Sequence, residues 1–537
     1  MNVQALFDAN EYITLTDYLQ RLGIKDVQTY LKATTVEDDN NYAHINEAVE
    51  QFMKYKEENK HIATLVDSDV DGYLSSSMLR SFIHNKYGID IQFFIHDKFP
   101  KAHGLNDREI QKELAESNVE LLFIPDASAN IHGNIYNKDG EQIEIIVLDH
   151  HNNVVEREDT ILVSNQYSPN VVNTVGSGTL VTWHFIHKLD EKLANKYISY
   201  VFISILSDSM SLLSDENRTF VDRGIKDIHL YLEPFVDKYN KDNTPKSYAY
   251  GGIIPRFNAT IRLADKQEKS DLFECLCGNQ DTLKKTLKTC THYYNQQNPM
   301  CADLIENNVD IDDESQKVLL CKINVQTPLT GLVANKLMSK YNKPIILVHD
   351  NENENECAGS ARCPMKLQKV LEASGKFNYA EGHDEAFGVS YQKKNEDDIK
   401  NFLYTLDLPK PIIDVVQSID VQQLSTSMIR NFENYDYLWA TNLKKPTYHI
   451  HGIKLKKDDI QVLGKTGTTI KFRIGDWDFI KFFCSHDWQE KTFIYDEMKI
   501  EVIGTLTWNE WQGAKTPQII IDDMEVKKDE LSFEDLF

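Results

Sequence analysis

The feature that most constrains this chain is the motif Asp149-His150-His151, which closes a short apolar run, residues 144–148. Three other apolar runs also end in an acidic residue, at Asp67, Asp126 and Asp208. Short apolar runs of this kind are typical of buried strands in a parallel sheet, and ligands of open α/β sheets bind at the carboxyl edge. We therefore expect an α/β fold in which carboxylates and imidazoles converge from several strand ends.

The loop after the first run reads Asp67-Ser-Asp69-Val-Asp71-Gly72. A turn can gather alternating aspartates round an ion, and Gly72 permits a tight exit into a helix. The loop also resembles half of a calcium-binding loop, but Met78 stands where that loop needs a bidentate glutamate. A plainer alternative is an Asp-rich turn in which Asp71 caps the following helix.

The residue types indicate the class of metal. Carboxylates with one or two imidazoles and no thiolate suit Mn²⁺ or Mg²⁺, and imidazole favours Mn²⁺. The eight cysteines are scattered without a CxxC pair, and we interpret them as reduced and structural. Two cations about 3.5–4 Å apart can activate water and stabilise both oxygens at a phosphorus centre. The motifs therefore predict phosphodiester hydrolysis with two divalent cations.

The 537 residues are long enough for several domains. We expect an α/β domain built on a parallel sheet and a second α/β domain joined to it by connecting helices, followed by a C-terminal OB-type β-barrel. The expected boundaries are 1–60 for a helical lead-in, 61–235 for the first α/β domain, 236–310 for the connecting helices, 311–435 for the second α/β domain, 436–527 for the barrel and 528–537 for an acidic tail. Without a membrane-length apolar stretch or a signal-peptide pattern, we expect a cytoplasmic protein with no membrane partner.

The net charge of −25 argues at first against a nucleic-acid partner, but phosphate binding needs only local basic surface. Residues 444–481 contain nine lysines and arginines against four aspartates, a net charge of +5. Aromatic residues alternate with these basic ones, as in strands that track phosphates and stack bases. An ordinary solvated surface is the alternative. In the second α/β domain, Ser360 and Arg362 follow a strand and could grip a phosphate, because arginine binds phosphate bidentately.

The ordered set of motifs resembles the DHH phosphoesterases, and more closely the RecJ-like single-strand exonucleases. The matching segments, in order, are 67–72, Asp126, 149–151, Asp208 with 216–218, 255–265, 359–362 and 382–388. Two segments depart from the pattern. Leu65 stands where many relatives have a histidine, and residues 101–105 replace an arginine and Gly-Tyr-Gly-Leu. We expect one metal to have an altered ligand set that leans on Asp67.

The resemblance implies roles for individual residues. The implied metal ligands are Asp69, Asp71, Asp126, His150 and Asp208, with Asp67 binding directly or through water. His151 would face the scissile phosphate, and Asp149 would orient a histidine. Ser360 and Arg362 would anchor the 5′ end, with Arg256, Asn258 and His383 nearby. We rank Arg262, from the same segment as Arg256, lower.

The leading hypothesis is a metal-dependent 5′→3′ exonuclease that degrades single-stranded DNA to mononucleotides in repair, recombination or replication. One alternative is a DHH enzyme acting on short RNA or cyclic dinucleotides. Another is a replication scaffold that has lost its metal. The acidic tail carries Leu531, Phe533 and Phe537, which could dock on a replication or repair protein, but the favoured interpretation is a disordered tail with no such role.

Overall fold

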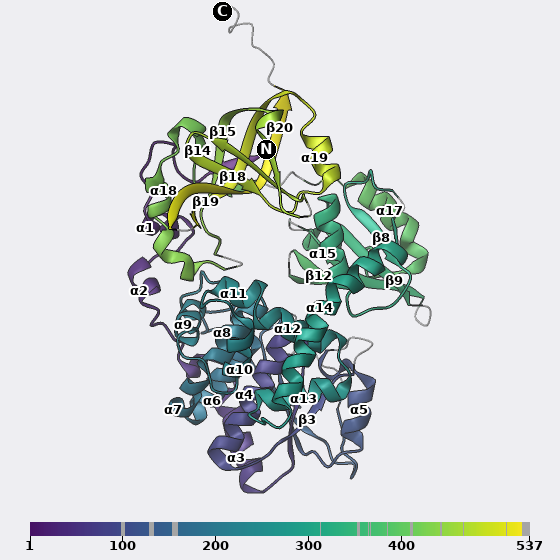
Figure 1. The fold of residues 1–537 in the computed structure, drawn as a ribbon. Helices are drawn as coiled ribbons and strands as arrows, with labels where there is room; N and C mark the ends of the chain where they lie inside the picture. Colours follow the sequence, from purple (N-terminus) through teal and green to yellow (C-terminus); the bar gives the residue numbers. More distant parts are fainter. Residues whose placement is uncertain are drawn as a thin grey trace, which may run out of the picture. The chain divides into compact units, whose positions relative to one another are not determined.

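The computed structural model describes residues 1–97, 103–127, 134–152, 159–311, 313–351, 355–363, 365, 367–383, 385–406, 408, 412–440, 443–465, 467–511 and 513–528. The chain forms two compact units (Figure 1). One contains residues 32–409, and the other combines residues 1–31 with residues 410–537. The predicted acidic tail lies outside the described residues apart from Lys528. No helix in the described part of the chain is both long and apolar enough to cross a membrane.

The first part of the larger unit is built on a five-stranded sheet in the order β3-β2-β4-β5-β6. Its strands are β2 (Ile62–Val66), β3 (Gln92–Ile95), β4 (Leu121–Pro125), β5 (Glu144–Asp149) and β6 (Thr160–Ser164). All neighbouring pairs are parallel. Nearly every residue of β2, β4 and β5 is buried, which explains the uninterrupted apolar runs in the sequence.

Helices cover both faces of this sheet. They are α3 (Ile45–Glu57), α4 (Val70–Tyr87), α5 (Arg108–Ala115), α6 (Gly178–Leu189), α7 (Glu191–Ala194) and α8 (Ile198–Ser207). On one face, Phe52 of α3 and Phe185 of α6 pack edge-on or tilted against Phe123 of β4. On the other, Ile110 and Leu114 of α5 join a buried apolar cluster with the strands.

A helical segment connects this sheet to a second one. Its helices are α9 (Asp215–Gly224), α10 (Glu233–Tyr239), α11 (Pro245–Tyr250), α12 (Ile253–Leu263), α13 (Lys266–Leu276) and α14 (Leu283–Asn307). The sequence predicts a loop over residues 251–258, and this is wrong. Only its first two residues precede α12, so Arg256 and Asn258 lie on a helix.

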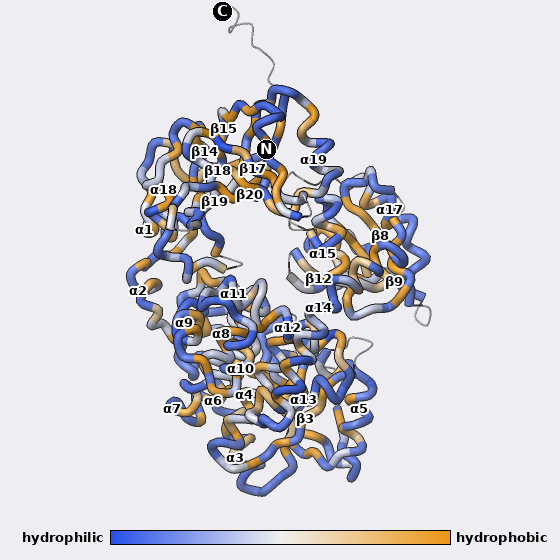
Figure 2. Tube along the Cα trace, in the orientation of Figure 1, coloured by the Kyte–Doolittle hydropathy of each residue, from blue (hydrophilic) through white to orange (hydrophobic). Residues whose placement is uncertain are grey.

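The second sheet has the order β11-β12-β10-β9-β8-β7. Its strands are β7 (Val309–Ile311), β8 (Leu319–Ile323), β9 (Ile345–Asn351), β10 (Glu356–Arg362), β11 (Tyr379–His383) and β12 (Ala386–Gln392). Helices α15 (Thr330–Tyr341), α16 (Gln368–Ala373) and α17 (Glu396–Thr405) complete this part. In Figure 2 the strands β8 and β9 are among the hydrophobic segments, and their side chains form the core.

The smaller unit is a seven-stranded sheet in the order β14-β15-β19-β20-β18-β17-β16. Its strands are β14 (Ser418–Asp420), β15 (Thr447–Lys456), β16 (Gln461–Leu463), β17 (Thr469–Ile474), β18 (Trp477–Lys481), β19 (Glu497–Trp511) and β20 (Ala514–Lys528), with helices α18 (Thr426–Arg430) and α19 (His486–Thr492). The last two strands are the longest of this sheet, with 15 residues each.

The N-terminal segment belongs to this smaller unit. Strand β1 (Val3–Ala5) pairs in parallel with β13 (Ile413–Val415), and α1 (Leu15–Arg21) follows it. The next helix, α2 (Val27–Lys32), ends at the boundary between the two units.

Candidate metal centre

The acidic residues lie at the carboxyl edge of the five-stranded sheet. Asp67 directly follows β2, Asp126 directly follows β4, and Asp149 ends β5. Because the chain passes from β2 outward to β3 and then back to β4, the connections diverge between β2 and β4. Such a switch point is where open α/β sheets bind ligands, so the topology places these carboxylates at the expected site.

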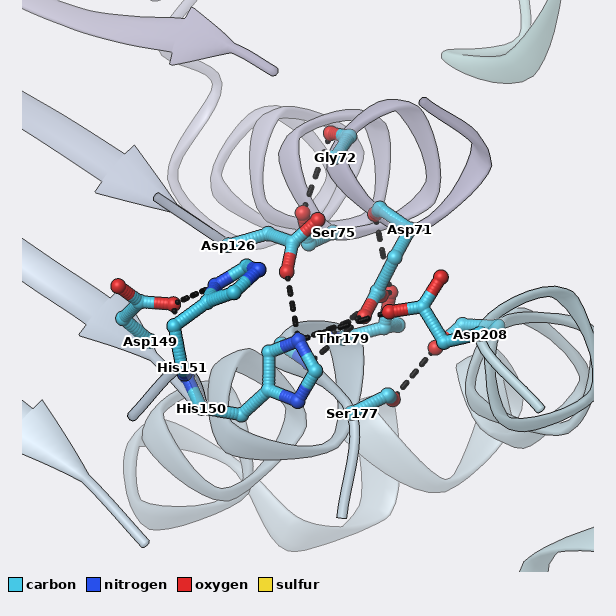
Figure 3. Close-up of polar contacts among 12 residues, drawn as sticks. Asp71, Gly72, Ser75, Asp126, Asp149, His150, His151, Ser177, Thr179 and Asp208 are labelled. Carbon is cyan, nitrogen blue, oxygen red and sulfur yellow. Dashed lines mark hydrogen bonds and ion pairs between the residues drawn. The ribbon is translucent and has the colours of Figure 1, made fainter. Parts of the chain in front are cut away.

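Four residues form the centre of the site. Ligand atoms of Asp71, Asp126, His150 and Asp208 all lie within 4.8 Å of one another. His150 Nε2 is 3.2 Å from Asp126 Oδ1, 3.5 Å from Asp208 Oδ2 and 3.9 Å from Asp71 Oδ2. Figure 3 shows these side chains converging from α4, the end of β4, the loop after β5 and the end of α8.

The backbone fixes the position of two of these carboxylates. Asp126 has a left-handed backbone conformation with φ of 65°, which aspartate tolerates better than most residues. Asp71 accepts hydrogen bonds from the amides of Gly178 and Thr179 at 2.7 and 2.8 Å, and from the Thr179 hydroxyl. These amides begin α6, so the positive end of a helix dipole stabilises the Asp71 carboxylate.

The carboxylates repel one another in this buried setting. Burial raises the pKa of Asp126 well above its usual range, and the charges of Asp71, Asp69 and Asp208 raise it further. Burial and the same neighbours, Asp71 and Asp69, also raise the pKa of Asp208. Burial and the adjacent His151 lower the pKa of His150, which favours the neutral imidazole that binds metals.

A divalent cation fits this donor set. Both carboxylate oxygens of Asp126 and the Nε2 atom of His150 are buried, and none of the three makes a hydrogen bond within the described residues. Buried polar atoms without partners are rare in native proteins and call for a specific explanation. A cation among these residues would satisfy the unpaired atoms and offset the clustered negative charge. Oxygen donors with one imidazole suit Mn²⁺ or Mg²⁺.

His151 lies beside this group in a different environment. Its side chain is 55% exposed, and its Nδ1 lies 2.8 Å from Asp149 Oδ1. The same carboxylate oxygen accepts hydrogen bonds from the backbone amides of His150 and His151. Burial alone would lower the pKa of His151, but the Asp149 charge and hydrogen bond raise it to about 10. The structure thus places the Asp149 carboxylate against Nδ1 of His151, and an orienting role for Asp149 stays a prediction.

A second group of potential metal ligands contains Asp67, Asp69 and His103, with ligand atoms again within 4.8 Å of one another. The sequence indicated Asp67 and Asp69 but not His103, which falls in the departing segment 101–105. Leu65 cannot bind a metal at this site, because its side chain has no ligand atom. It is 1% exposed and packs in a buried apolar cluster with Phe94 and Leu105.

Two of the predicted phosphate ligands lie together in the second sheet. Ser360 and Arg362, on β10, both approach Gly331 at the start of α15. A Cβ atom on Gly331 would lie 2.4 Å from an Arg362 guanidinium nitrogen and 3.6 Å from Ser360 Oγ. Burial lowers the pKa of Arg362 to about 10, and the nearby positive charge of Arg262 contributes to this shift. Two arginines and a hydroxyl beside a helix N-terminus can bind a phosphate.

Arg262, which the sequence ranked below the other substrate ligands, is a half-buried arginine that interacts with charged residues of both the metal-ligand group and the predicted phosphate ligands. Burial lowers its pKa, and the charge of Asp69 opposes this shift. Arg262 therefore interacts electrostatically with both Asp69 and Arg362. Its position in the same sequence segment as Arg256 and Asn258 was the signal for it in the sequence.

The other predicted substrate ligands lie differently. The Arg256 guanidinium donates hydrogen bonds to the carbonyls of Gly251 and Gly252 at 2.5 and 2.7 Å, and lies over the Tyr239 and Tyr294 rings. These contacts hold the connecting helices together. Asn258 is half-buried on the same helix. The His383 side chain lies outside the described part of the structure. Substrate roles for these three residues stay predictions.

The origin of Asp208 requires a correction. The sequence predicted that Asp208 ends an apolar strand, but residues 198–207 form helix α8, and Asp208 caps its carboxyl end. The side chain still reaches the site. A short apolar run fits a buried helix as well as a buried strand, and here the helix forms.

The smaller unit exposes aromatic side chains near its basic strands. Phe482 and Phe483, just after β18, are 46% and 95% exposed. A hollow nearby in sequence is lined by Gln461, Lys471, Phe472 and Arg473. Lys471 and Arg473 both form ion pairs with Asp478, at 2.9 and 2.6 Å, so part of the predicted positive charge is neutralised.

Comparisons with known proteins agree with this architecture. Residues 61–205 match the family model described as the DHH family, N-terminal domain, and residues 417–523 match the RecJ OB domain. The chain is 28% identical to YorK of Bacillus subtilis (strain 168), an SPbeta prophage-derived protein provisionally named a single-strand DNA-specific exonuclease, with 97% of each chain covered. It is 20% identical to the single-stranded-DNA-specific exonuclease RecJ of the same organism, over 90% of this chain and 64% of RecJ.

Solved structures show the same fold. Crystal structures of RecJ from Thermus thermophilus in complex with Mn²⁺ and with Mg²⁺ superpose with TM-scores of 0.70 and 0.65, each at 18% identity. Each covers 91% of this chain and, respectively, 72% and 71% of the RecJ chain. The matches identify residues 61–205 as a DHH-family domain and residues 417–523 as a RecJ OB domain. The chain is similar to RecJ proteins over most of its length.

Proposed function

We propose that this protein is a metal-dependent exonuclease that degrades single-stranded DNA in the 5′→3′ direction and releases mononucleotides. The observation that carries the proposal is the convergence of Asp71, Asp126, His150 and Asp208, whose buried ligand atoms include three without hydrogen-bond partners in the described structure. The names of the full-length relatives support single-stranded DNA as the substrate.

Two divalent cations, when bound, would supply activated water and stabilise the attacking and leaving oxygens at phosphorus. The chain's own residues would position the substrate. Asp149 fixes the ring orientation of His151, and its charge and hydrogen bond raise the pKa of His151, which favours the protonated ring. We assign His151 to hydrogen bonding with the scissile phosphate and to proton donation.

Exonuclease polarity requires a site that holds one end of the strand. Ser360 and Arg362 face the start of α15, and Arg262 interacts electrostatically with both Arg362 and Asp69. A terminal 5′ phosphate bound there would place a phosphodiester bond of the same strand at the metal-binding edge. The exposed Phe482 and Phe483 would stack on bases further along the strand, without base preference.

We place this activity in DNA repair, recombination or replication in the cytoplasm. We assign to the C-terminal tail the binding of a replication or repair protein. A pull-down with and without residues 528–537 tests the tail. Comparing turnover of long strands with that of dinucleotides separates this proposal from an enzyme of short RNA or cyclic dinucleotides. Metal analysis of the purified protein separates it from a scaffold without metal.

The decisive experiment follows single strands of DNA and RNA labelled at either end, with Mn²⁺, Mg²⁺ or a chelator. We expect 5′-labelled DNA to yield labelled mononucleotide at once, and 3′-labelled DNA to shorten progressively, only with metal present. Asp126→Asn and His150→Gln should each lower turnover by at least about a hundredfold, the scale typical of losing one essential catalytic interaction. The exposed Asp313→Asn serves as the matched control. Wild-type turnover in either site variant would refute the proposal.

Arg362→Ala tests the end-binding site. Loss of a bidentate phosphate contact should raise KM for 5′-phosphorylated strands by about tenfold or more, corresponding to roughly 1.5–3 kcal/mol for a charged hydrogen bond. The value of kcat should change much less. The preference for phosphorylated over unphosphorylated 5′ ends should decrease, whereas Lys369→Ala, an exposed control on α16, should retain it. An unchanged end preference in Arg362→Ala would assign the anchor elsewhere.

A further inference from the structure

The second ligand group has an imidazole that comes from outside the motifs recognised in the sequence. His103 lies just before a short 3-10 turn, Gly104–Asn106, and reaches the carboxyl edge of β2. Its Nδ1 atom is 2.6 Å from Asp67 Oδ2, while the amide of Gly104 donates a hydrogen bond of 2.9 Å to Asp67 Oδ1. Residues 103 and 104 therefore contact both oxygens of the Asp67 carboxylate.

The neighbouring backbone keeps Asp67 and Asp69 close together. Asp69 caps α4 by accepting a hydrogen bond of 3.0 Å from the Gly72 amide. A Cβ atom on Gly72 would lie 2.6 Å from Asp67 Cβ, so only glycine lets the helix start so near to Asp67. The start of α4 thus holds the two carboxylates close together, and His103 supplies the third ligand atom of the group.

A third element points to a bound ion at this position. His96, directly after β3, is 1% exposed, and its Nδ1 lies 2.8 Å from Asp107 Oδ2. Its buried Nε2 faces Asp67, 3.9 Å from Oδ1, and has no hydrogen-bond partner in the described structure. A carboxylate behind one nitrogen of an imidazole, with the other nitrogen unpaired, is the arrangement that proteins use beside metal ions.

We propose that Asp67, Asp69 and His103 hold a divalent cation, with His103 as its imidazole ligand and His96, backed by Asp107, as the residue that positions Asp67. The inference rests on the proposed function, because this ion would be the second of the pair. It assigns the imidazole to a residue outside the predicted ligand set. Carboxylates with one imidazole favour Mn²⁺ over Mg²⁺ at this position.

An ordinary surface ion pair is the competing interpretation of His103 and Asp67. The chain provides a suitable comparison in His84 and Asp90, whose Nδ1–Oδ1 distance is 2.8 Å and whose side chains are both more than half exposed. Asp67 differs because it is 2% exposed and also accepts a hydrogen bond from the Gly104 amide. The buried, unpaired nitrogen of His96 further distinguishes this site from a surface pair.

Mn²⁺ binding to the full chain, measured by equilibrium dialysis, tests the proposal without reference to activity. We expect two ions per wild-type chain and per His84→Gln chain. In His103→Gln the affinity for one of the two ions should fall by at least about tenfold, and His96→Gln should weaken the same ion by roughly 10–100-fold, as for other residues that orient metal ligands. Asp208→Asn should instead weaken the other ion.

Asp69→Asn provides a second variant if His103→Gln does not fold, because asparagine still caps a helix while the charged ligand is lost. It too should lose the second ion. Two ions bound with wild-type affinity in both His103→Gln and Asp69→Asn would overturn the assignment. A single ion in the wild type, unaffected by His103→Gln, would overturn it and leave a one-metal nuclease. If the wild-type chain bound no Mn²⁺ at all, the proposed metal-dependent nuclease function would be refuted as well.

Discussion

At the scale of single residues, the metal centre depends on a position that has no side chain. Gly178 begins α6 so close to Asp126 that an added Cβ atom would lie 2.5 Å from Asp126 Oδ1 and 2.7 Å from its Cβ. Gly178→Ala should therefore displace the Asp126 carboxylate and lower both Mn²⁺ affinity and turnover by about tenfold or more, given the steep dependence of catalysis on geometry. In the control Gly251→Ala, the new Cβ meets no atom within 4 Å. Equal Mn²⁺ affinity in Gly178→Ala and wild type would contradict this dependence.

The sequence allowed prediction of those site residues that directly follow buried strands. Asp67 and Asp126 were recognisable because an apolar run leads into each, and parallel strands end at one edge. The same rule applied to residues 92–95 would have indicated His96. His103 and Arg262 follow no strand. Tertiary folding brings them near the site, and no local sequence pattern marks this. Gly178 was visible only as the entrance to a helix.

At the scale of elements, α6 ties the site to the segment that precedes the sheet. Its buried His184 contacts Asp39 Oδ1 of the 3-10 helix Asp39–Asn41 at 2.7 Å and Glu216 Oε1 of α9 at 3.1 Å. Burial lowers the pKa of His184, but Glu216 and Asp39 outweigh it and raise the pKa to about 9 from 6.5. A raised pKa stabilises the fold fully below pH 6.5, and this contribution is lost as the pH rises through about 9. The shift corresponds to about 3 kcal/mol.

Urea unfolding between pH 6.5 and 10 measures this contribution. The wild type should lose stability across the window, and His184→Gln should be less stable at pH 6.5 with a flatter pH dependence. His229→Gln is the control, because burial and Lys196 lower the pKa of His229 to about 4, so this histidine is neutral throughout. A wild-type pH slope in His184→Gln would show that another group titrates in this range.

The sequence predicted helices and strands correctly where the apolar pattern was specific, and incorrectly where the pattern was ambiguous. The runs of β2, β4 and β5 are only five or six residues long between polar loops, and this length favours strands over helices. The run before Asp208 is equally apolar but has ten residues in α8, and burial on all sides removes the periodicity that marks a helix. In α12, the glycines and the proline at its start concealed the helix, although proline is favoured in a first turn.

At the scale of the whole molecule, the smaller unit is made from both ends of the chain. Strand β1 pairs with β13 through Val3↔Ile413, and the Gln417 amide nitrogen donates hydrogen bonds to the carbonyls of Asp8 and Glu11. Tyr18 of α1 packs edge-on against Phe432 and Trp439. Sequence patterns report local structure, and the apolar spacing of residues 15–21 gave no sign of a partner about 400 residues away.

This division predicts opposite outcomes for two truncations. A chain of residues 1–409 keeps the N-terminal segment without its partner and exposes Leu15, Tyr18 and Leu19, each buried in the intact unit. Exposing such side chains costs about 1.5–3 kcal/mol each, so residues 1–31 should be unfolded, prone to association and removed first by limited proteolysis. Residues 32–409 alone should remain monomeric and bind Mn²⁺, since every ligand of both groups lies in that unit. Their activity should fall more on long strands than on short ones, because the aromatic surface is lost. Equal protease resistance of residues 1–31 in the 1–409 and full-length chains would show that this segment folds without residues 410–537.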